Sequence, residues 1–133
     1  MNLAIDTHAL AYHLGRKKKR LGRRAGRVLE RVERGLDRLV VPFTVMEELM
    51  LLSEAGKVRL PMPFRELVVS FMRADNLELG VNDPELLLEA AALTGVRDPY
   101  DRMIIAQARI AGAPLITGDE DIQNSGLVRV VWD

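Results

Sequence analysis

The sequence predicts an α/β fold with a mainly parallel sheet of five strands. Two observations predict this class. Short apolar runs alternate with longer stretches of helical periodicity, and no internal repeat or low-complexity linker interrupts the pattern. The 133 residues, 48% of them apolar, are enough to enclose one core of normal size. We therefore expect residues 1–133 to form a single domain.

Five apolar runs predict the strands. Each run is short, and most are followed by a turn residue or by the start of a helix. In chain order, the predicted strands are residues 3–5, 39–41, 77–79, 114–117 and 128–131.

Helical spacing of apolar residues and helix-capping signals predict about six helices between these strands. The predicted helices are residues 7–14, 21–36, 45–55 and 63–73, a Leu- and Ala-rich helix from Pro84, and a helix from Pro99 to Gly112. Asp83 and Asp98 precede prolines and are expected to cap their helices. Thr44, followed by Glu47 three residues later, has the pattern of a capping box.

Composition excludes several kinds of site. The chain has no cysteine, so a disulfide, a thiolate metal site and a cysteine nucleophile are all impossible. Two histidines disfavour a zinc site. No segment reaches the roughly 20 apolar residues of a membrane-spanning helix, and MNLAIDTHAL does not resemble a secretory signal. We expect a cytoplasmic protein without a membrane partner.

The net charge of zero hides an uneven distribution. Residues 1–38 contain 11 Lys or Arg and 4 Asp or Glu, whereas residues 39–133 contain 8 and 15. Most of the basic excess lies in residues 16–27. This segment is either a phosphate-binding surface or an ordinary solvated surface. The candidate nucleic-acid contacts are Arg16, Lys17, Lys18, Lys19 and Arg20.

Four acidic residues occupy positions from which they can converge. Asp6 directly follows a predicted strand, Asp119 follows another after Gly118, and Glu48 and Asp101 lie near the starts of predicted helices. Ligands of parallel sheets gather at the carboxyl ends of the strands. Two carboxylates 4 Å apart repel by about 4 kcal/mol at an effective dielectric of 20, and Mg²⁺ offsets such repulsion with oxygen ligands. Phosphodiester hydrolysis by a metal-activated water is the reaction implied.

Each acid also has a structural explanation. Asp6 can cap the helix that begins at the next residue, Asp101 suits the positive end of its helix, and Asp119 can belong to a solvated turn. The capping box accounts for Glu47. Glu48 is therefore the better candidate for a metal ligand on that helix.

Several motifs occur in one order over nearly the whole chain, and RDPYDRMIIAQA is the most specific. They are IDTHAL (5–10), a helix with EEL (47–49) followed by GKVRLP (56–61), RDPYDRMIIAQA (97–108), PLITGDEDI (114–122) and VRVVW (128–132). Through these motifs the chain resembles a PIN-domain ribonuclease, and within that family the VapC-like toxins of type II toxin–antitoxin pairs.

The resemblance implies a three-layer α/β/α fold and a Mg²⁺-dependent, or Mn²⁺-dependent, endoribonuclease that cleaves single-stranded RNA. It assigns the four catalytic and metal-binding acids to Asp6, Glu48, Asp101 and Asp119. It assigns supporting roles to Thr7 or Thr117, whose hydroxyl would lie near the metal, and to two further acids, Asp98 and Asp121.

The resemblance also implies partners. A cognate antitoxin would place its tail, with an arginine, against the acids, and the toxin would form a homodimer. The methionine-containing helices at 45–55 and 63–73 can supply such an interface or simply pack in the core.

This sequence departs from the family pattern at two places. Glu47 stands where many relatives have an aromatic residue, which leaves the choice between Glu47 and Glu48 open, and the basic segment is heavier than usual. His8 follows Asp6 by two positions and is not expected to face the metal, so His8 and His13 are interpreted as packing or surface residues. The proposed chemistry does not require a histidine base.

Two other functions compete with this interpretation. The first is a catalytically inactive PIN-fold module for RNA binding or assembly, and retention of all four acids disfavours it. The second is a two-component receiver domain, which needs an aspartate after a central strand and a later lysine. The third predicted strand ends in Leu79-Gly80, and no lysine follows Lys57, so this rival is also disfavoured.

Overall fold

A computed structural model describes all 133 residues, and five parallel strands form one sheet in the order β3-β2-β1-β4-β5. The strands are β1 (Asn2–Ile5), β2 (Arg38–Val41), β3 (Leu77–Leu79), β4 (Leu115–Ile116) and β5 (Val130–Val131). The helices are α1 (Thr7–Leu14), α2 (Arg23–Glu33), α3 (Phe43–Glu54), α4 (Phe64–Arg73), α5 (Pro84–Ala91), α6 (Pro99–Ala111) and α7 (Glu120–Ser125), with a 3₁₀ turn, η1 (Lys18–Arg20).

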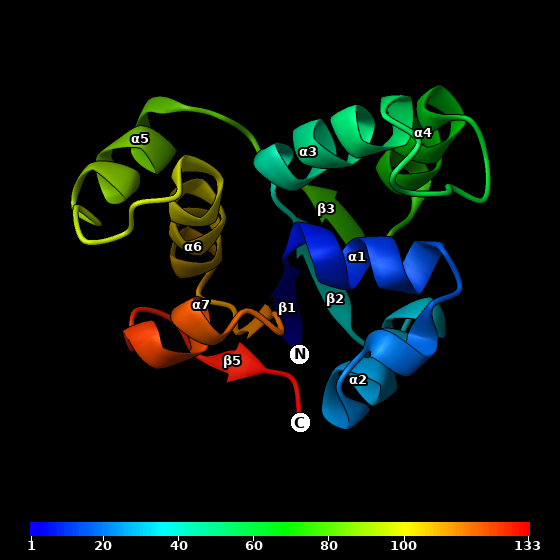
Figure 1. Cartoon of the computed structure of the whole chain (residues 1–133), viewed down its shortest axis with the longest axis horizontal. Helices are drawn as coiled ribbons and strands as arrows, with labels where there is room; N and C mark the ends of the chain where they lie inside the picture. Colours follow the sequence, from blue (N-terminus) through cyan, green and yellow to red (C-terminus); the bar gives the residue numbers. More distant parts are fainter.

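The helices form a layer on each face of the sheet. Figure 1 shows α1 to α4 on one side and α5 to α7 on the other. This division follows from the strand order, because right-handed crossovers from β1 through β2 to β3 run in one direction and those from β3 through β4 to β5 run in the opposite direction. The predicted three-layer α/β/α fold with a parallel five-stranded sheet is confirmed.

The strand order places β1 at the centre of the sheet. Its neighbours are β2 on one side and β4 on the other. Strands β2 and β3 follow β1 in one direction across the sheet, and β4 and β5 lie in the opposite direction, so the strand order reverses between β1 and β4. Leu3, Ala4 and Ile5 have no exposed surface, as expected for a strand covered by helices on both faces. The carboxyl ends of β1 and β4 are therefore the position where a ligand site is expected.

The predicted capping box at Thr44 is wrong. Helix α3 already begins at Phe43, and no side chain caps it. The carbonyl oxygen of Pro42 accepts hydrogen bonds from the amides of Val45 at 3.0 Å and Met46 at 3.3 Å. Because Pro42 both ends the strand and starts the helix, Thr44 lies inside the first turn and is buried.

Two other helix predictions differ from the structure. Helix α2 ends at Glu33, because Gly35 adopts a left-handed conformation with φ of 75°. Leu36, expected on its apolar face, lies outside the helix and is 56% exposed. Helix α7 was not predicted. Only one of its side chains, Ile122, is buried, so the segment has no apolar periodicity to indicate a helix.

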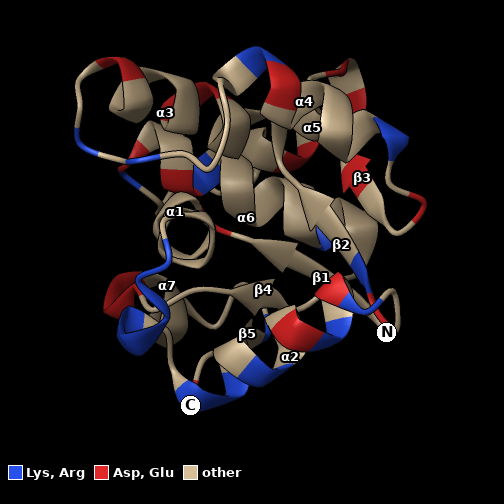
Figure 2. Cartoon of the chain, turned by 90° about the vertical axis from the view of Figure 1, so that its right-hand side faces the viewer, with Lys and Arg blue, Asp and Glu red and all other residues tan.

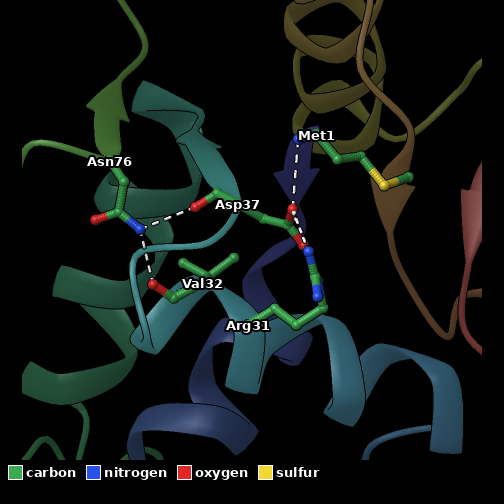
Figure 3. A network of polar contacts seen from close by, with 5 residues as sticks. All are labelled: Met1, Arg31, Val32, Asp37 and Asn76. Atoms are coloured by element: carbon green, nitrogen blue, oxygen red, sulfur yellow. Dashed lines mark hydrogen bonds and ion pairs between the residues drawn. The ribbon is translucent and has the colours of Figure 1, made fainter.

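A polar network fixes the amino-terminal edge of the sheet, opposite the strand ends described above. Buried Asp37, directly before β2, accepts a 2.8 Å hydrogen bond from Arg31 Nε on α2 and lies 3.3 Å from the Met1 amino group. Asn76, directly before β3, donates from Nδ2 to the carbonyl oxygens of Val32 and Asp37 (Figure 3). The network ties α2 to three neighbouring strands.

None of the helices combines the length and apolarity that a bilayer crossing requires.

Candidate active site

Asp6 lies at the junction of β1 and α1 and has two structural bonds. Its Oδ1 accepts a 2.8 Å hydrogen bond from the Ala9 amide, which caps α1, and its Oδ2 accepts a hydrogen bond from the Thr117 hydroxyl. Asp6 therefore caps α1, as the sequence predicts. Capping does not exclude a role in a site, because the side chain lies at the carboxyl end of the central strand.

Thr117 connects the ends of the two central strands. It directly follows β4, is fully buried, and receives a 3.1 Å hydrogen bond at Oγ1 from the Asp119 amide. Asp119 in turn caps α7, because its Oδ1 accepts a 3.1 Å hydrogen bond from the Ile122 amide. One threonine hydroxyl thus positions both Asp6 and the loop that carries Asp119.

Glu48 is anchored by a second threonine. Buried Thr7, at the start of α1, donates its hydroxyl hydrogen to Glu48 Oε1 at 2.6 Å. Glu47, its half-buried neighbour on α3, has no side-chain hydrogen bond of this kind and no ion pair. The structure therefore favours Glu48 over Glu47 as the α3 acid that faces the strand ends.

Asp101 lies in the first turn of α6 and is half-buried. Asp98 caps this helix and accepts hydrogen bonds from the amides of Tyr100 at 2.9 Å and Asp101 at 3.0 Å. Burial raises the pKa of Asp101 to about 6, and neighbouring negative charges add to this effect in the order Asp98, Asp119, Glu48 and Asp6. All four sequence-predicted acids thus interact at one edge of the sheet.

The pKa of Asp6 is also raised. Burial is the main cause, and the charge of Asp119 adds to it. The hydrogen bonds from Thr117 and Ala9, together with the charge of His8, oppose the shift. Carboxylates with raised pKa values favour a proton or a cation beside them.

The four carboxylates interact without already forming a closed ligand cage. No group of three or more His, Asp or Glu side chains is placed to hold a metal ion directly, so the expected meeting of four acids within the reach of one ion is only partly realised. The donor chemistry fits a hard divalent cation, because every side chain of the cluster offers carboxylate oxygen. Mg²⁺ usually retains several water ligands.

Two cavities of similar volume adjoin the helices that carry the acids. The first, of about 620 Å³, lies between the α5–α6 loop and α7 and is lined by Arg97, Asp98, Asp101 and Asp121 among others. The second, of about 610 Å³, lies between α1, η1 and the α3–α4 loop. Asp98 and Asp121, predicted to support the site, therefore line the first cavity beside Asp101.

Only some of the predicted basic contacts line the second cavity. Lys17 and Arg20 line the second cavity, whereas Arg16, Lys18 and Lys19 do not. Lys57 and Arg59 also line it. They were not singled out as contacts, although both belong to the GKVRLP motif.

The two histidines differ in their surroundings. His8 is exposed and its ring lies 6.3 Å from that of Tyr12, centroid to centroid. His13 forms a 2.9 Å ion pair with Glu33, and burial lowers the pKa of His13.

Trp132 is a further residue that sequence reasoning missed. A Cβ atom on Gly118 would lie 2.6 Å from the Trp132 ring, so the ring packs directly on the residue before Asp119. The contact depends on the absence of a side chain at Gly118, and its only sequence signal is the glycine in PLITGDEDI.

The fold and the site together define a three-layer α/β domain with a carboxylate cluster at the point where the strand order reverses. A search with family sequence profiles matches the PIN domain over residues 3–126. The chain therefore belongs to the PIN domain family. A search of curated protein sequences finds no match.

Solved structures with the same fold include three toxin–antitoxin complexes. VapBC2 from Rickettsia felis, bound to a DNA fragment from its promoter, has a TM-score of 0.70 at 15% identity, covering 100% of both chains. A toxin–antitoxin complex from Klebsiella pneumoniae has a TM-score of 0.66 at 17% identity, covering 97% of this chain and 95% of that one. VapBC-1 from nontypeable Haemophilus influenzae has a TM-score of 0.62 at 18% identity, covering 98% and 96%.

Proposed function

We propose that this chain is a Mg²⁺-dependent endoribonuclease that hydrolyses phosphodiester bonds in single-stranded RNA. The observation that supports the proposal best is the gathering of acids at the strand ends, where Thr117 and Thr7 hold the carboxylates of Asp6 and Glu48. Burial raises the pKa of Asp101 beside them, and the charges of the neighbouring acids add to the shift. Membership of the PIN domain family supports the same chemistry. A cluster that accumulates negative charge without a paired arginine or lysine has the character of a cation site.

Asp6, Glu48, Asp101 and Asp119 would hold the metal, with Mn²⁺ as a possible substitute. When bound, a divalent cation activates water as a nucleophile and stabilises negative charge on a phosphate. Thr117 and Thr7 would keep Asp6 and Glu48 oriented, because each donates its hydroxyl hydrogen to the carboxylate. Asp98 would hold the first turn of α6, and with it Asp101, in place.

We further propose that the chain is the toxin of a type II toxin–antitoxin pair in the cytoplasm. The toxin–antitoxin complexes that share its fold support this assignment. A cognate antitoxin would place an arginine against the acids, since a guanidinium group forms charge-assisted hydrogen bonds with carboxylates. A homodimer is proposed from the same resemblance.

The proposal is tested by cleavage of a defined single-stranded RNA with purified, metal-depleted protein. We expect cleavage with Mg²⁺ or Mn²⁺ and none with EDTA. Asp6→Asn and Asp101→Asn should each reduce the rate by at least about a hundredfold, since each removes a charged ligand. Glu47→Gln is the matched control, because it neutralises an adjacent acid outside the cluster and should keep the full rate.

Two results would contradict the proposal. One is cleavage that persists in EDTA, and the other is full activity of Asp101→Asn in preparations free of contaminating nuclease. RNA binding without cleavage in any metal would instead indicate the inactive binding module considered above.

A further inference from the structure

The second cavity, which we call the basic groove, carries an inference beyond the acids. Its polar and aromatic lining consists of His8, Tyr12, Lys17, Arg20, Lys57 and Arg59. These residues come from two stretches of chain about forty positions apart. One is α1 with the segment up to η1, and the other is the loop after α3.

The two walls of the groove meet at the end of α1. A Cβ atom on Gly15 would lie 3.4 Å from the Arg59 carbonyl oxygen, so the α3–α4 loop lies directly against this turn. Figure 2 shows the Lys- and Arg-containing segments that follow α1 and α3 on the same side of the molecule, on either side of α1. The groove is therefore a built feature of the fold and not a chance gap between loops.

The cations in the groove have no acidic partner. Lys17, Arg20, Lys57 and Arg59 take part in none of the ion pairs of the structure, and no carboxylate lines the groove. The first cavity, which Asp101 of the cluster lines, has three aspartates and one arginine. A polyanion that reaches the acids would therefore approach along the basic groove.

Aromatic groups connect the groove to the acids. His8 and Tyr12 lie one turn apart on α1, with tilted rings 6.3 Å apart. The Arg20 guanidinium lies over the Tyr12 ring, 5.8 Å from its centroid. Asp6 caps α1, and His8 lies two positions later in the first turn of that helix and lines the groove. His8, Tyr12 and Arg20 therefore form a row that begins in the turn of α1 next to Asp6 and runs along the groove.

We propose that the basic groove holds the single-stranded RNA segment next to the bond that is cut. Lys57 and Arg59 on one wall and Lys17 on the other contact its phosphates, and a base stacks on the surface formed by Tyr12 and Arg20. Cationic grooves with exposed aromatic rings suit single strands, because every unpaired base offers a flat face. That the bound molecule is the RNA substrate rests on the proposed function. Binding of single-stranded RNA in the groove can be measured independently of cleavage.

The test measures binding of a fluorescein-labelled 12-nucleotide RNA in EDTA, where no metal-dependent cleavage occurs. For Lys57→Ala/Arg59→Ala we expect a Kd at least about tenfold higher and a slope of log K against log salt about 1.4 smaller, since two phosphate contacts are lost. Arg65→Ala/Arg73→Ala is the control. It removes the same charge from exposed positions on α4 outside the groove and should bind as the wild type does.

A second variant tests base stacking. Tyr12→Leu should raise Kd about fivefold or more for an ordinary RNA. The effect should disappear for an RNA of the same length whose central nucleotides are abasic, because that strand has phosphates but nothing to stack. Thermal unfolding of each variant checks that the fold is kept.

Three outcomes would overturn the inference. Lys57→Ala/Arg59→Ala could bind RNA as tightly as the wild type, or the α4 control could lose affinity equally. Polyglutamate of matched charge could also compete as well as RNA, which would indicate an acidic protein segment in the groove. A protein that binds RNA through the groove but never cleaves it would refute the proposed function and support the groove.

Discussion

Thr117 and Asp6 are 111 positions apart in the sequence, and the hydroxyl of one donates a hydrogen bond to the carboxylate of the other. This bond joins the ends of β4 and β1, the two neighbouring strands between which the chain direction across the sheet reverses. The bond that holds the first acid therefore lies at the position where a ligand site is expected in a parallel sheet.

Replacement of Thr117 by valine should impair both stability and activity. The variant keeps the volume but removes a buried donor to a carboxylate, which costs about 1.5 to 3 kcal/mol. Because the Thr117 bond lowers the pKa of Asp6, that pKa should rise further in the variant and the pH optimum should move upward. Urea unfolding and the pH dependence of cleavage measure the two effects. Thr117→Ser keeps the hydroxyl and should retain the wild-type profile.

Asp101→Asn should stabilise the metal-free protein above pH 6. The pKa of Asp101 is raised from 3.8 to about 6, so between these values the folded state binds more protons than the unfolded state, and the free energy of unfolding falls as pH rises. Asparagine does not titrate, so the variant does not lose free energy of unfolding over this pH range. We expect a gain of about 1 kcal/mol at pH 7, after discounting for solvent screening of a half-buried group, and none near pH 3. The expectation would be contradicted if the wild type and Asp101→Asn had the same free energy of unfolding at pH 7 as well as near pH 3.

Mg²⁺ should raise the unfolding temperature of the wild type. A ligand that binds only the folded state adds about 1.4 kcal/mol at ten times its Kd. Trp132, the only tryptophan, packs on Gly118 beside Asp119, so its fluorescence gives a second readout without any RNA. Both signals should be lost in Asp101→Asn and kept in Glu47→Gln. A titration to several millimolar with no change in either signal would argue against a metal site.

Asp37 should control stability in acid without affecting activity. Hydrogen bonding to Arg31 lowers the pKa of Asp37, and the Met1 amino group adds to this. The network therefore contributes its full stability above the unfolded pKa of about 3.8 and loses it as pH falls further. Asp37→Asn should remove this acid dependence and lower the unfolding temperature at pH 7. Cleavage at 25 °C should be unchanged, because the network lies at the opposite edge of the sheet.

The sequence predicted the sheet and the acids because their signals are local. A strand followed at once by an aspartate appears at Asp6, and again near Asp119. These residues also cap helices, so the capping role is confirmed and the role in a metal site remains a proposal. Such positions can be recognised without knowledge of long-range contacts.

Contacts between distant segments could not be predicted in the same way. The Thr7–Glu48 hydrogen bond joins residues 41 positions apart, and no spacing rule links Lys57 to Lys17 across the basic groove. The error at Thr44 has a local cause. A capping box and a proline that starts a helix two residues earlier give competing signals, and the backbone carbonyl of Pro42 satisfies the first amides.

Glu47 and Glu48 allow the sharpest test of the site, because they are adjacent, chemically identical and both half-buried. Only Glu48 accepts a hydrogen bond from Thr7 and contributes to the raised pKa of Asp101. Glu48→Gln should therefore lower the pKa of Asp101, as followed by carboxyl carbon NMR in metal-free protein, while burial and the charges of Asp98 and Asp119 keep that pKa above its ordinary value. It should also weaken Mg²⁺ binding and reduce cleavage by about tenfold or more. Glu47→Gln should change none of these quantities, and the opposite pattern would transfer the ligand role to Glu47.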